Sequence, residues 1–459
     1  MNDMEHTERT RALQEDALRY VLLNLGDYTD IEMSGAKIIE RGEGCYVYDT
    51  DGRKFLDSFG SLLSAVCGHN RPEVHEAMLE QMQKLEFFPS YHDGFTPVII
   101  QLAKRLAKIA PGDLEVSFFV NGGSEATEAA IKMARQYFWE RGEKARRKIL
   151  FRRNSYHGAT LGALSATGLP WFREPQDPLV PGFVPVMSPH PFRCELGLEP
   201  EESARIALQN TEAIIQWEGP ETIAAMILDP IPGSNVGYPV PPPFYLPELK
   251  AICEKYGILT IYDEIQVGMG KTGKMFCCEN WNVVPDMLCL AKCFSGGFAP
   301  IGVVLTTAEI ADIFRRPGHE FRHGHTFCGH PVAAAAVMAV LDIFEKEKLV
   351  ERAAEMGAYL REKLEELYKY PIVGDVRGMG LLQAVELVAD KKTRALLQPP
   401  GQVGGFVRDY CYRHNMILRN NEEILVVAPP LVITREIIDE MVGNIDAGIA
   451  AAVKHFGLG

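Results

Sequence analysis

Residues 116–140 read VSFFVNGGSEATEAAIKMARQYFWE, and this stretch decides the fold. Its first five residues form an apolar run typical of a buried strand, and a glycine-rich turn follows. Beyond the turn, apolar residues recur at helical spacing, at Ala126, Ala130, Met133 and Tyr137. The stretch therefore predicts a strand, a tight turn and a helix, which is the repeating unit of a wound α/β sheet.

The same rhythm continues along the middle of the chain. Four more segments have the apolar character of buried strands: KILFR (148–152), AAMILDP (224–230), ILTIYDE (258–264) and MLCLAK (287–292). Helical patterns such as LPELKAICEKYG (246–257) separate some of them. This alternation predicts an α/β fold whose ligands bind beyond the carboxyl ends of the strands.

The pattern changes after Pro331, where a smaller α+β domain is expected to close over the first. The expected elements are helices at 332–346 and about 348–368, short strands near 381–388, 415–419 and 424–428, and a last helix from Thr434.

The composition excludes several classes of protein. The chain has 459 residues and a formal net charge of −14, so its surface would repel nucleic acids and anionic membranes. The N-terminal residues are polar and lack the apolar core of a signal peptide, and no apolar stretch is long enough to span a bilayer. None of the ten cysteines forms a Cys-x-x-Cys pair, so free thiols are expected and no metal site. We therefore expect a cytoplasmic protein.

Three positions near predicted strand ends carry residues suited to chemistry. Gly123 and Ser124 open a helix, where backbone N–H groups can hold a phosphate; a simple turn capped by Ser124 is the alternative. Asp263 and Glu264 end an apolar run, and a buried carboxylate needs a partner such as a protonated ring nitrogen, or a plain salt bridge. Desolvation at Lys292 would favour the neutral amine that Schiff-base chemistry requires; a surface lysine is the alternative.

The segment GMGKTG (268–273) partly matches the sequence motifs of nucleotide-binding loops. It matches G-x-G-x-x-G after a strand, and Gly270, Lys271 and Thr272 match the end of a P-loop. However, Ile265 stands where a P-loop has its first glycine, and no convincing helix follows. A nucleotide-binding protein is therefore only a third hypothesis.

Six motifs together resemble the class III (subgroup II) pyridoxal-phosphate aminotransferases. They are NGGSEATEAAIKMAR (121–135), YHGATLGALSATG (156–168), DEIQVGMGKTG (263–273), LAKCFSGGFAPIGVVL (290–305), HGHTFCGHPVAAAA (323–336) and APPLVIT (428–434). The resemblance runs from about residue 44 to residue 437 and implies fold type I, with a large mixed-sheet cofactor domain and a smaller α+β domain. We expect these domains at 76–330 and 331–459, with an N-terminal segment (1–75) joining the small domain.

The resemblance also implies roles around the ring of the cofactor, pyridoxal 5′-phosphate. Lys292 would form a Schiff base with it and move protons as general base and acid. Asp263 would pair with the ring nitrogen and keep it protonated. Tyr156 would stack on one ring face with His157 beside it, and Ile265 would cover the other face.

Further positions would hold the phosphate and the ring hydroxyl. By the same resemblance, Gly123 and Ser124 would bind the phosphate through backbone and hydroxyl donors, and Gln266 would lie near the ring hydroxyl. Thr326 would reach the phosphate of the neighbouring subunit. The site would therefore need a homodimer with shared active sites, and a tetramer stays open.

The substrate pocket is expected to follow the branch of amine–pyruvate (ω-amine) enzymes. Ser234 stands where ornithine- and GABA-type members have a gating Glu, and Asp229 replaces the usual first Glu. Arg419 matches the arginine that grips the acceptor carboxylate, a task suited to its bidentate fork; an exposed hairpin residue is the alternative. The amine pocket would be lined by Leu62, Leu63, Phe88 and Tyr91.

The expected activity is transfer of an amino group from an ω-amine or ω-amino acid to an oxo acid such as pyruvate, with ping-pong kinetics. Taurine, β-alanine or a diamine would fit as donor. The alternative within the same fold is an amino-acid racemase, epimerase or decarboxylase that also uses Lys292.

Overall fold

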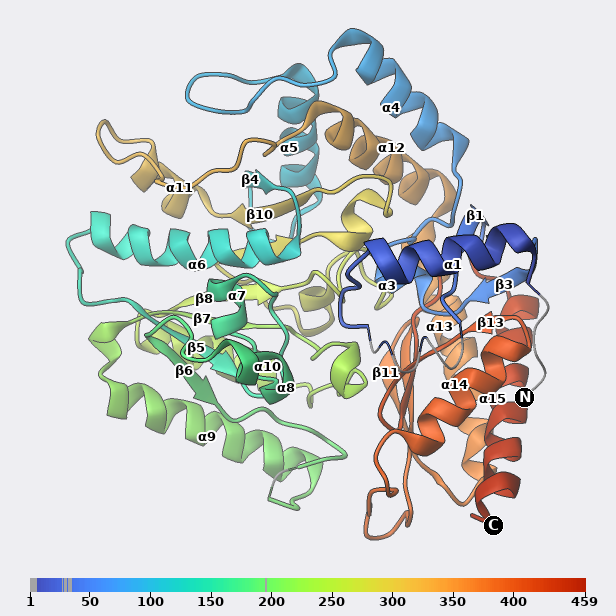
Figure 1. Ribbon diagram of the computed structural model, residues 1–459. Helices are drawn as coiled ribbons and strands as arrows, with labels where there is room; N and C mark the ends of the chain where they lie inside the picture. The colour runs from blue at the N-terminus through green and yellow to red at the C-terminus, as the bar shows by residue number, and fades with distance from the viewer. Residues whose placement is uncertain (1–5, 27, 29–30, 32–34, 195) are drawn as a thin grey trace.

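The computed structural model describes residues 6–26, 28, 31, 35–194 and 196–459. Its largest sheet has seven strands (Figure 1), in the order β4 (Val116–Val120), β10 (Gly302–Thr306), β9 (Met287–Leu290), β8 (Leu259–Asp263), β7 (Ile223–Leu228), β5 (Lys148–Arg152) and β6 (Phe183–Val186). The strands from β9 to β6 run parallel, whereas β10 pairs antiparallel with both β4 and β9. This mixed sheet confirms the expected α/β class.

Helices cover both faces of this sheet (Figure 1). On one face, α6 (Gly123–Glu140) packs against β7 residues such as Ile227. On the other face, α9 (Pro200–Glu218) and α10 (Tyr245–Lys255) share a core with Met226, the residue before Ile227 in β7. Successive strand residues point to opposite faces, so both sets must be apolar. This explains why β7 is buried at all six positions and shows no polar alternation.

A second sheet is built from the C-terminal third of the chain. It is antiparallel, in the order β11 (Val373–Met379), β12 (Leu382–Leu387), β15 (Ile424–Val427) and β14 (Arg419–Asn421). The helices of this region are α12 (Pro331–Glu347), α13 (Leu349–Glu365), α14 (Gln402–Arg413) and α15 (Arg435–Phe456). All three predicted helices are present here, and α14 was not predicted.

The helix α12 packs with the part of the molecule that contains the seven-stranded sheet, not with the C-terminal sheet. It lies against α4 (Pro72–Lys84) and α5 (Pro97–Ile109) (Figure 1). It also contacts η5 (Lys292–Ser295). The chain then passes through α13 into the C-terminal part. The division at residue 331 stays a prediction.

A third sheet ties the N-terminal residues to the C-terminal part. Its order is β1 (Ile39–Glu43), β2 (Tyr46–Asp49), β3 (Lys54–Asp57) and β13 (Met416–Ile417), with β3 and β13 parallel. The strand expected at 415–419 is present as two short strands in different sheets instead of a single one. The chain changes sheets at Leu418, so that β13 pairs with β3 while β14 pairs with β15.

The short helices are α3 (Gly60–Leu63), α7 (Leu161–Ser165), α8 (Pro170–Arg173) and α11 (Ala308–Phe314), and α1 (Glu8–Tyr20) precedes the first strand. Within the described residues, no helix has both the length and the apolar character needed to cross a membrane. All ten cysteines are free, as expected.

Candidate active site

A cavity of about 600 Å³ lies beyond the carboxyl ends of the parallel strands. Lining residues come directly from these ends: Asn121 follows β4, Tyr156 follows β5, Asp229 follows β7, Asp263 ends β8 and Lys292 follows β9. Eleven of the fourteen predicted site residues line the cavity: Leu62, Leu63, Gly123, Ser124, Tyr156, His157, Asp263, Ile265, Gln266, Lys292 and Arg419. The sheet topology thus brings together residues that are far apart in sequence.

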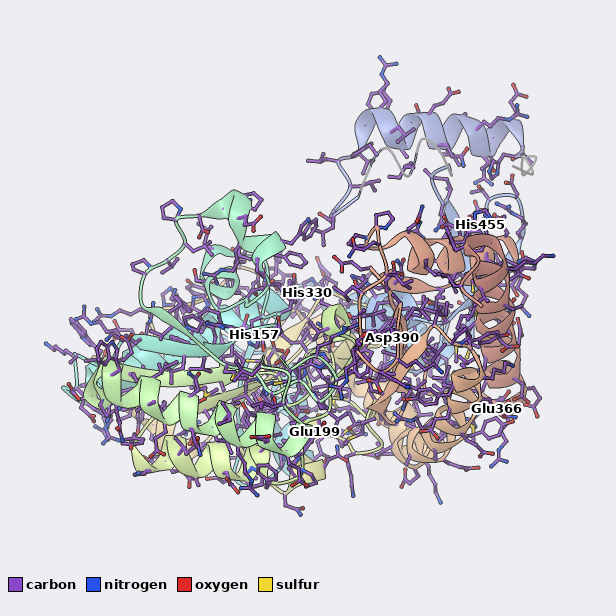
Figure 2. The ribbon with its side chains drawn as sticks, turned by 90° about the horizontal axis from the view of Figure 1, so that it is seen from below. His157, Glu199, His330, Glu366, Asp390 and His455 are labelled. Atoms are coloured by element: carbon purple, nitrogen blue, oxygen red, sulfur yellow. The ribbon has the colours of Figure 1, made fainter. Side chains whose placement is uncertain are left out.

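Asp263 is held rigidly by its neighbours. Its Oδ2 lies 2.8 Å from His157 Nδ1, and its Oδ1 accepts the backbone N–H of Ile265 at 3.0 Å. Both side chains are buried, and His157 lies within the part built on the seven-stranded sheet (Figure 2). Because a carboxylate can only accept, His157 donates through Nδ1–H. The pair presents a fixed acceptor at the end of β8.

Lys292 has the environment that a reactive amine needs. It starts the 3-10 helix η5 rather than ending β9, and its φ of 48° lies in the left-handed region that non-glycine residues rarely adopt. Burial lowers the pKa of Lys292 to about 8, against the opposing attraction of Asp263. The share of neutral amine near neutral pH is therefore larger than in an exposed lysine.

The start of α6 forms a cradle for an anion. Gly122 precedes the helix, and no side chain caps its first turn, so backbone N–H groups at this end lack intrahelical partners. Ser124 Oγ accepts the N–H of Ala159 at 3.0 Å. At Gly158, with φ of +134°, a Cβ would lie 2.6 Å from this Oγ, so only glycine allows the close approach.

The remaining predicted cofactor contacts line the same cavity. Ile265 packs against the start of α6, where a Cβ on Gly123 would lie only 3.0 Å from its side chain. Gln266 Oε1 accepts hydrogen bonds from the backbone N–H and the hydroxyl of Ser234, at 3.2 and 3.3 Å. Burial raises the pKa of Tyr156, whose ring lies 5.1 Å from that of Phe172.

Three predicted residues lie outside the cavity of the single chain: Phe88, Tyr91 and Thr326. Tyr91 lines a second cavity of about 770 Å³, and its ring lies next to Gly324. The rings of Phe87 and Phe327 are 5.2 Å apart, so the segments carrying all three residues pack against each other. That Phe88 and Tyr91 line a substrate pocket, and that Thr326 reaches a cofactor phosphate, stay predictions. Both predictions depend on a second subunit.

Several lining residues were not predicted from the sequence. Leu25 and Phe172 line the cavity, although they come from segments without any recognised motif. Asp229 was noted only as a substitution; its Oδ1 accepts hydrogen bonds from the buried Arg152 at 2.9 Å and from Ser155 at 2.7 Å. Arg152 lies on the neighbouring strand β5 but 77 positions away in the sequence, so no local signal could have identified this pair.

The GMGKTG segment does not form a nucleotide site. Lys271 is fully buried, and its Nζ donates to the carbonyl oxygens of Ala428 at 3.1 Å and Pro429 at 3.0 Å. Turns and the 3-10 helix η4 (Cys277–Trp281) follow the segment instead of an α-helix. A lysine occupied in this way cannot reach a phosphate, so the nucleotide hypothesis is wrong.

The donor set fits pyridoxal phosphate. An uncapped helix start suits the phosphate, a buried carboxylate suits a protonated ring nitrogen, and an amine of lowered pKa suits its aldehyde. Within the described residues, no cluster of three or more His, Cys, Asp or Glu side chains is placed to hold a metal ion.

Comparisons with known proteins agree with this arrangement. The family model described as class-III aminotransferase matches residues 31–449. The chain is 35% identical to a putrescine–pyruvate aminotransferase of Pseudomonas aeruginosa, over 96% of each chain.

Solved structures are similar over nearly the whole length. An (S)-enantioselective omega-transaminase of Thermomicrobium roseum has a TM-score of 0.94 and 39% identity, covering 98% of this chain and 100% of its own. An omega-transaminase of Pseudomonas jessenii in complex with PMP also has a TM-score of 0.94, at 36% identity, covering 97% and 99%. The fold is that of the fold type I transaminases, and the chain belongs to the class III aminotransferases, enzymes that use pyridoxal phosphate to transfer amino groups from amines to oxo acids.

Proposed function

We propose that this enzyme transfers the amino group of an ω-amine or ω-amino acid to a small oxo acid such as pyruvate. The observation that carries the proposal is Arg419, which lines the same cavity as Lys292. Within the described part of the chain, no carboxylate lies within ion-pair distance of its guanidinium, and its buried Nε has no hydrogen-bond partner. Burial lowers the pKa of Arg419, against the opposing effect of Tyr238. A desolvated, uncompensated cation is a strong receptor for a carboxylate.

The relatives support the donor and acceptor classes. The names of similar proteins specify putrescine with pyruvate in one case and omega-transamination in others. On the donor side, Leu62, Leu63 and Phe172 give part of the cavity wall an apolar character that suits an aliphatic chain. Taurine, β-alanine and diamines remain within this class. The comparisons give no support to the racemase, epimerase or decarboxylase alternative.

Each residue has a definite task in this proposal. The bound cofactor supplies an electron sink that weakens the C–H bond at the amine-bearing carbon. Asp263 would hold a proton on the ring nitrogen, and Lys292 Nζ would take the proton from the substrate carbon as general base and give it back as general acid. Gly123 and Ser124 bind the phosphate. Because donor and acceptor use one cavity in turn, the kinetics should be ping-pong.

A homodimer with shared active sites is part of the proposal. Tyr91 and the exposed Phe95 line the second cavity, and the exposed Phe327 next to Thr326 adds a further apolar side chain on the segment that packs there. A clustered apolar surface of this kind is typical of an interface. A second copy covering it would bring Thr326, Phe88 and Tyr91 close to the neighbouring cavity.

The role of Arg419 can be tested by comparing two acceptors. Arg419→Ala should lower kcat/KM for pyruvate by about a hundredfold, the usual cost of losing one partner of a buried charge pair. The value for an uncharged aldehyde such as propanal should change little. Arg413→Ala, which removes an exposed arginine of the same region, should alter neither. An equal loss with both acceptors in Arg419→Ala would contradict the proposed role.

A further inference from the structure

Asn421 is the neighbour of Arg419 on the same side of β14. The two residues are separated by one position, so their side chains point to the same face of the strand. Asn421 Oδ1 accepts a hydrogen bond from Arg419 Nη2 at 3.4 Å, and its Nδ2–H donates to the backbone oxygen of Ser234 at 2.7 Å. The amide therefore connects the arginine to another wall of the cavity.

Ser234 is itself fixed from the cofactor side. It begins the 3-10 helix η3 (Ser234–Val236) and bonds through its N–H and hydroxyl to Gln266 Oε1. Arg377 Nη2 donates to the oxygen of Val236 at 2.9 Å and holds the other end of η3. A continuous path of hydrogen bonds thus runs from Gln266 after β8, through Ser234 and Asn421, to Arg419.

The chemistry of this path depends on Asn421 being an amide. A side-chain amide both donates and accepts, so one residue can satisfy the Ser234 oxygen and orient the guanidinium. A carboxylate at 421 would repel the Ser234 oxygen and form an ion pair with Arg419, which would then compete with substrate. The neutral amide contributes one long hydrogen bond and leaves the positive charge uncompensated.

We propose that Asn421 is a positioning residue that holds Arg419 against η3 and thereby determines how strongly the site prefers acceptors with a carboxylate. This inference rests on the proposed function, because it requires Arg419 to bind the acceptor carboxylate. It adds that the preference needs a neutral bridging amide at position 421.

The test uses the purified holoenzyme and the same two acceptors, pyruvate and propanal. The quantity measured is the ratio of kcat/KM for pyruvate to kcat/KM for propanal in wild type, Asn421→Ala and Asn421→Asp. Asn421→Ala should lower the ratio about tenfold, and Asn421→Asp should lower it further through a raised KM for pyruvate. With a donor that has no carboxylate, the rate of the first half-reaction should fall less than kcat/KM for pyruvate does.

Asn420→Ala is the matched control. Asn420 is the same residue type on the opposite face of β14, where its Nδ2 bonds to the oxygen of Glu422 in the turn. A merely structural effect of changing this hairpin would lower both acceptor rates together in every variant and leave the ratio unchanged; that result would overturn the inference.

Arg419→Ala separates this inference from the proposed function. If Arg419→Ala loses the preference for pyruvate while both Asn421 variants keep it, Asn421 has no positioning role, but the proposed function stands. If Arg419→Ala keeps the preference, the role of Arg419 is wrong, and the inference fails with it.

Discussion

At the scale of single residues, the chemistry depends on what surrounds Lys292. Its amine is desolvated, and the pKa falls to about 8 even though the buried Asp263 attracts its charge. The left-handed backbone at this position indicates strain that the surrounding structure must maintain. The environment of Lys292 therefore favours a reactive neutral amine and maintains a strained backbone.

The lowered pKa of Lys292 predicts a pH profile for cofactor uptake. Only the neutral amine attacks an aldehyde, so the rate at which apoenzyme binds pyridoxal phosphate should rise with pH and level off above about pH 8. Stopped-flow absorbance from pH 6 to 10 measures this rate, with N-acetyl-lysine amide as the reference amine. A midpoint in the protein as high as that of the reference would contradict the desolvated environment.

The sequence identified the residues whose motifs are local. Lys292, Asp263 and Gly123 were each predicted from an apolar strand followed by an unusual end, and all three line the cavity. Asn421 was not singled out, because its importance comes from contact with Ser234, 187 positions away. Single-sequence reasoning has no access to such pairings.

At the scale of elements, the site depends on close packing between strand ends and the start of α6. Ser124, Gly158 and Ala159 come together there, so that a hydroxyl in the first turn of α6 accepts an N–H from the loop after β5. The sequence predicted five of the seven strands of the main sheet, and α6, because their patterns are local; β6 and β10 were not predicted. It missed the division of the strand at 415–419, since the change of sheet at Leu418 is decided by tertiary pairing.

Gly158→Ala should weaken cofactor binding. The new Cβ would lie 2.6 Å from Ser124 Oγ at a φ that side chains rarely adopt, so the start of α6 must shift. We expect the dissociation constant for pyridoxal phosphate to rise about tenfold, the size of a strained-backbone penalty. Gly443→Ala, where the added methyl meets open space, is the control. Unchanged affinity in Gly158→Ala would show that this contact does not shape the phosphate cradle.

The buried carboxyl group of Glu264 should make the stability of the loop after β8 depend on pH. Its carboxylate accepts the N–H groups of Cys277 and Cys278 at 2.6 and 2.7 Å, yet burial raises the pKa of Glu264 to about 7. The folded state then binds this proton more tightly than the unfolded state. Its contribution to stability is therefore greatest at low pH and is lost as pH rises from about 4.5 through 7.

Glu264→Gln removes this titration. The Tm of Glu264→Gln minus the Tm of wild type should therefore be more positive at pH 8 than at pH 5. Thermal melts at both pH values measure this difference. A difference that is constant over this range would mean that Glu264 titrates normally in the folded protein.

At the scale of the whole molecule, the single chain leaves the proposed site incomplete. Tyr91 lines a second cavity instead of the first, and Phe88 and Thr326 line neither of the two. The alternation of strand and helix patterns predicted the α/β architecture in outline, but no residue pattern could show which surface a second copy covers. That surface becomes visible only when distant segments are folded together.

The proposed dimer predicts linked losses of assembly and activity. Light scattering should give twice the 51.1 kDa mass of the chain. Phe327→Glu, at a side chain that is 56% exposed, should shift the protein toward monomer and reduce activity in parallel. Trp217→Glu changes an even more exposed aromatic residue on α9 and should affect neither. A fully active monomer would rule out shared active sites.

The most direct test of the central claim, transamination through Lys292, is the visible absorption spectrum of the purified protein with candidate amines and then pyruvate. We expect a yellow cofactor band that bleaches with an ω-amine in the absence of acceptor, returns when pyruvate is added, and is altered in Lys292→Ala. A band that persists with every amine, or bleaches and never returns with any oxo acid, would contradict the account.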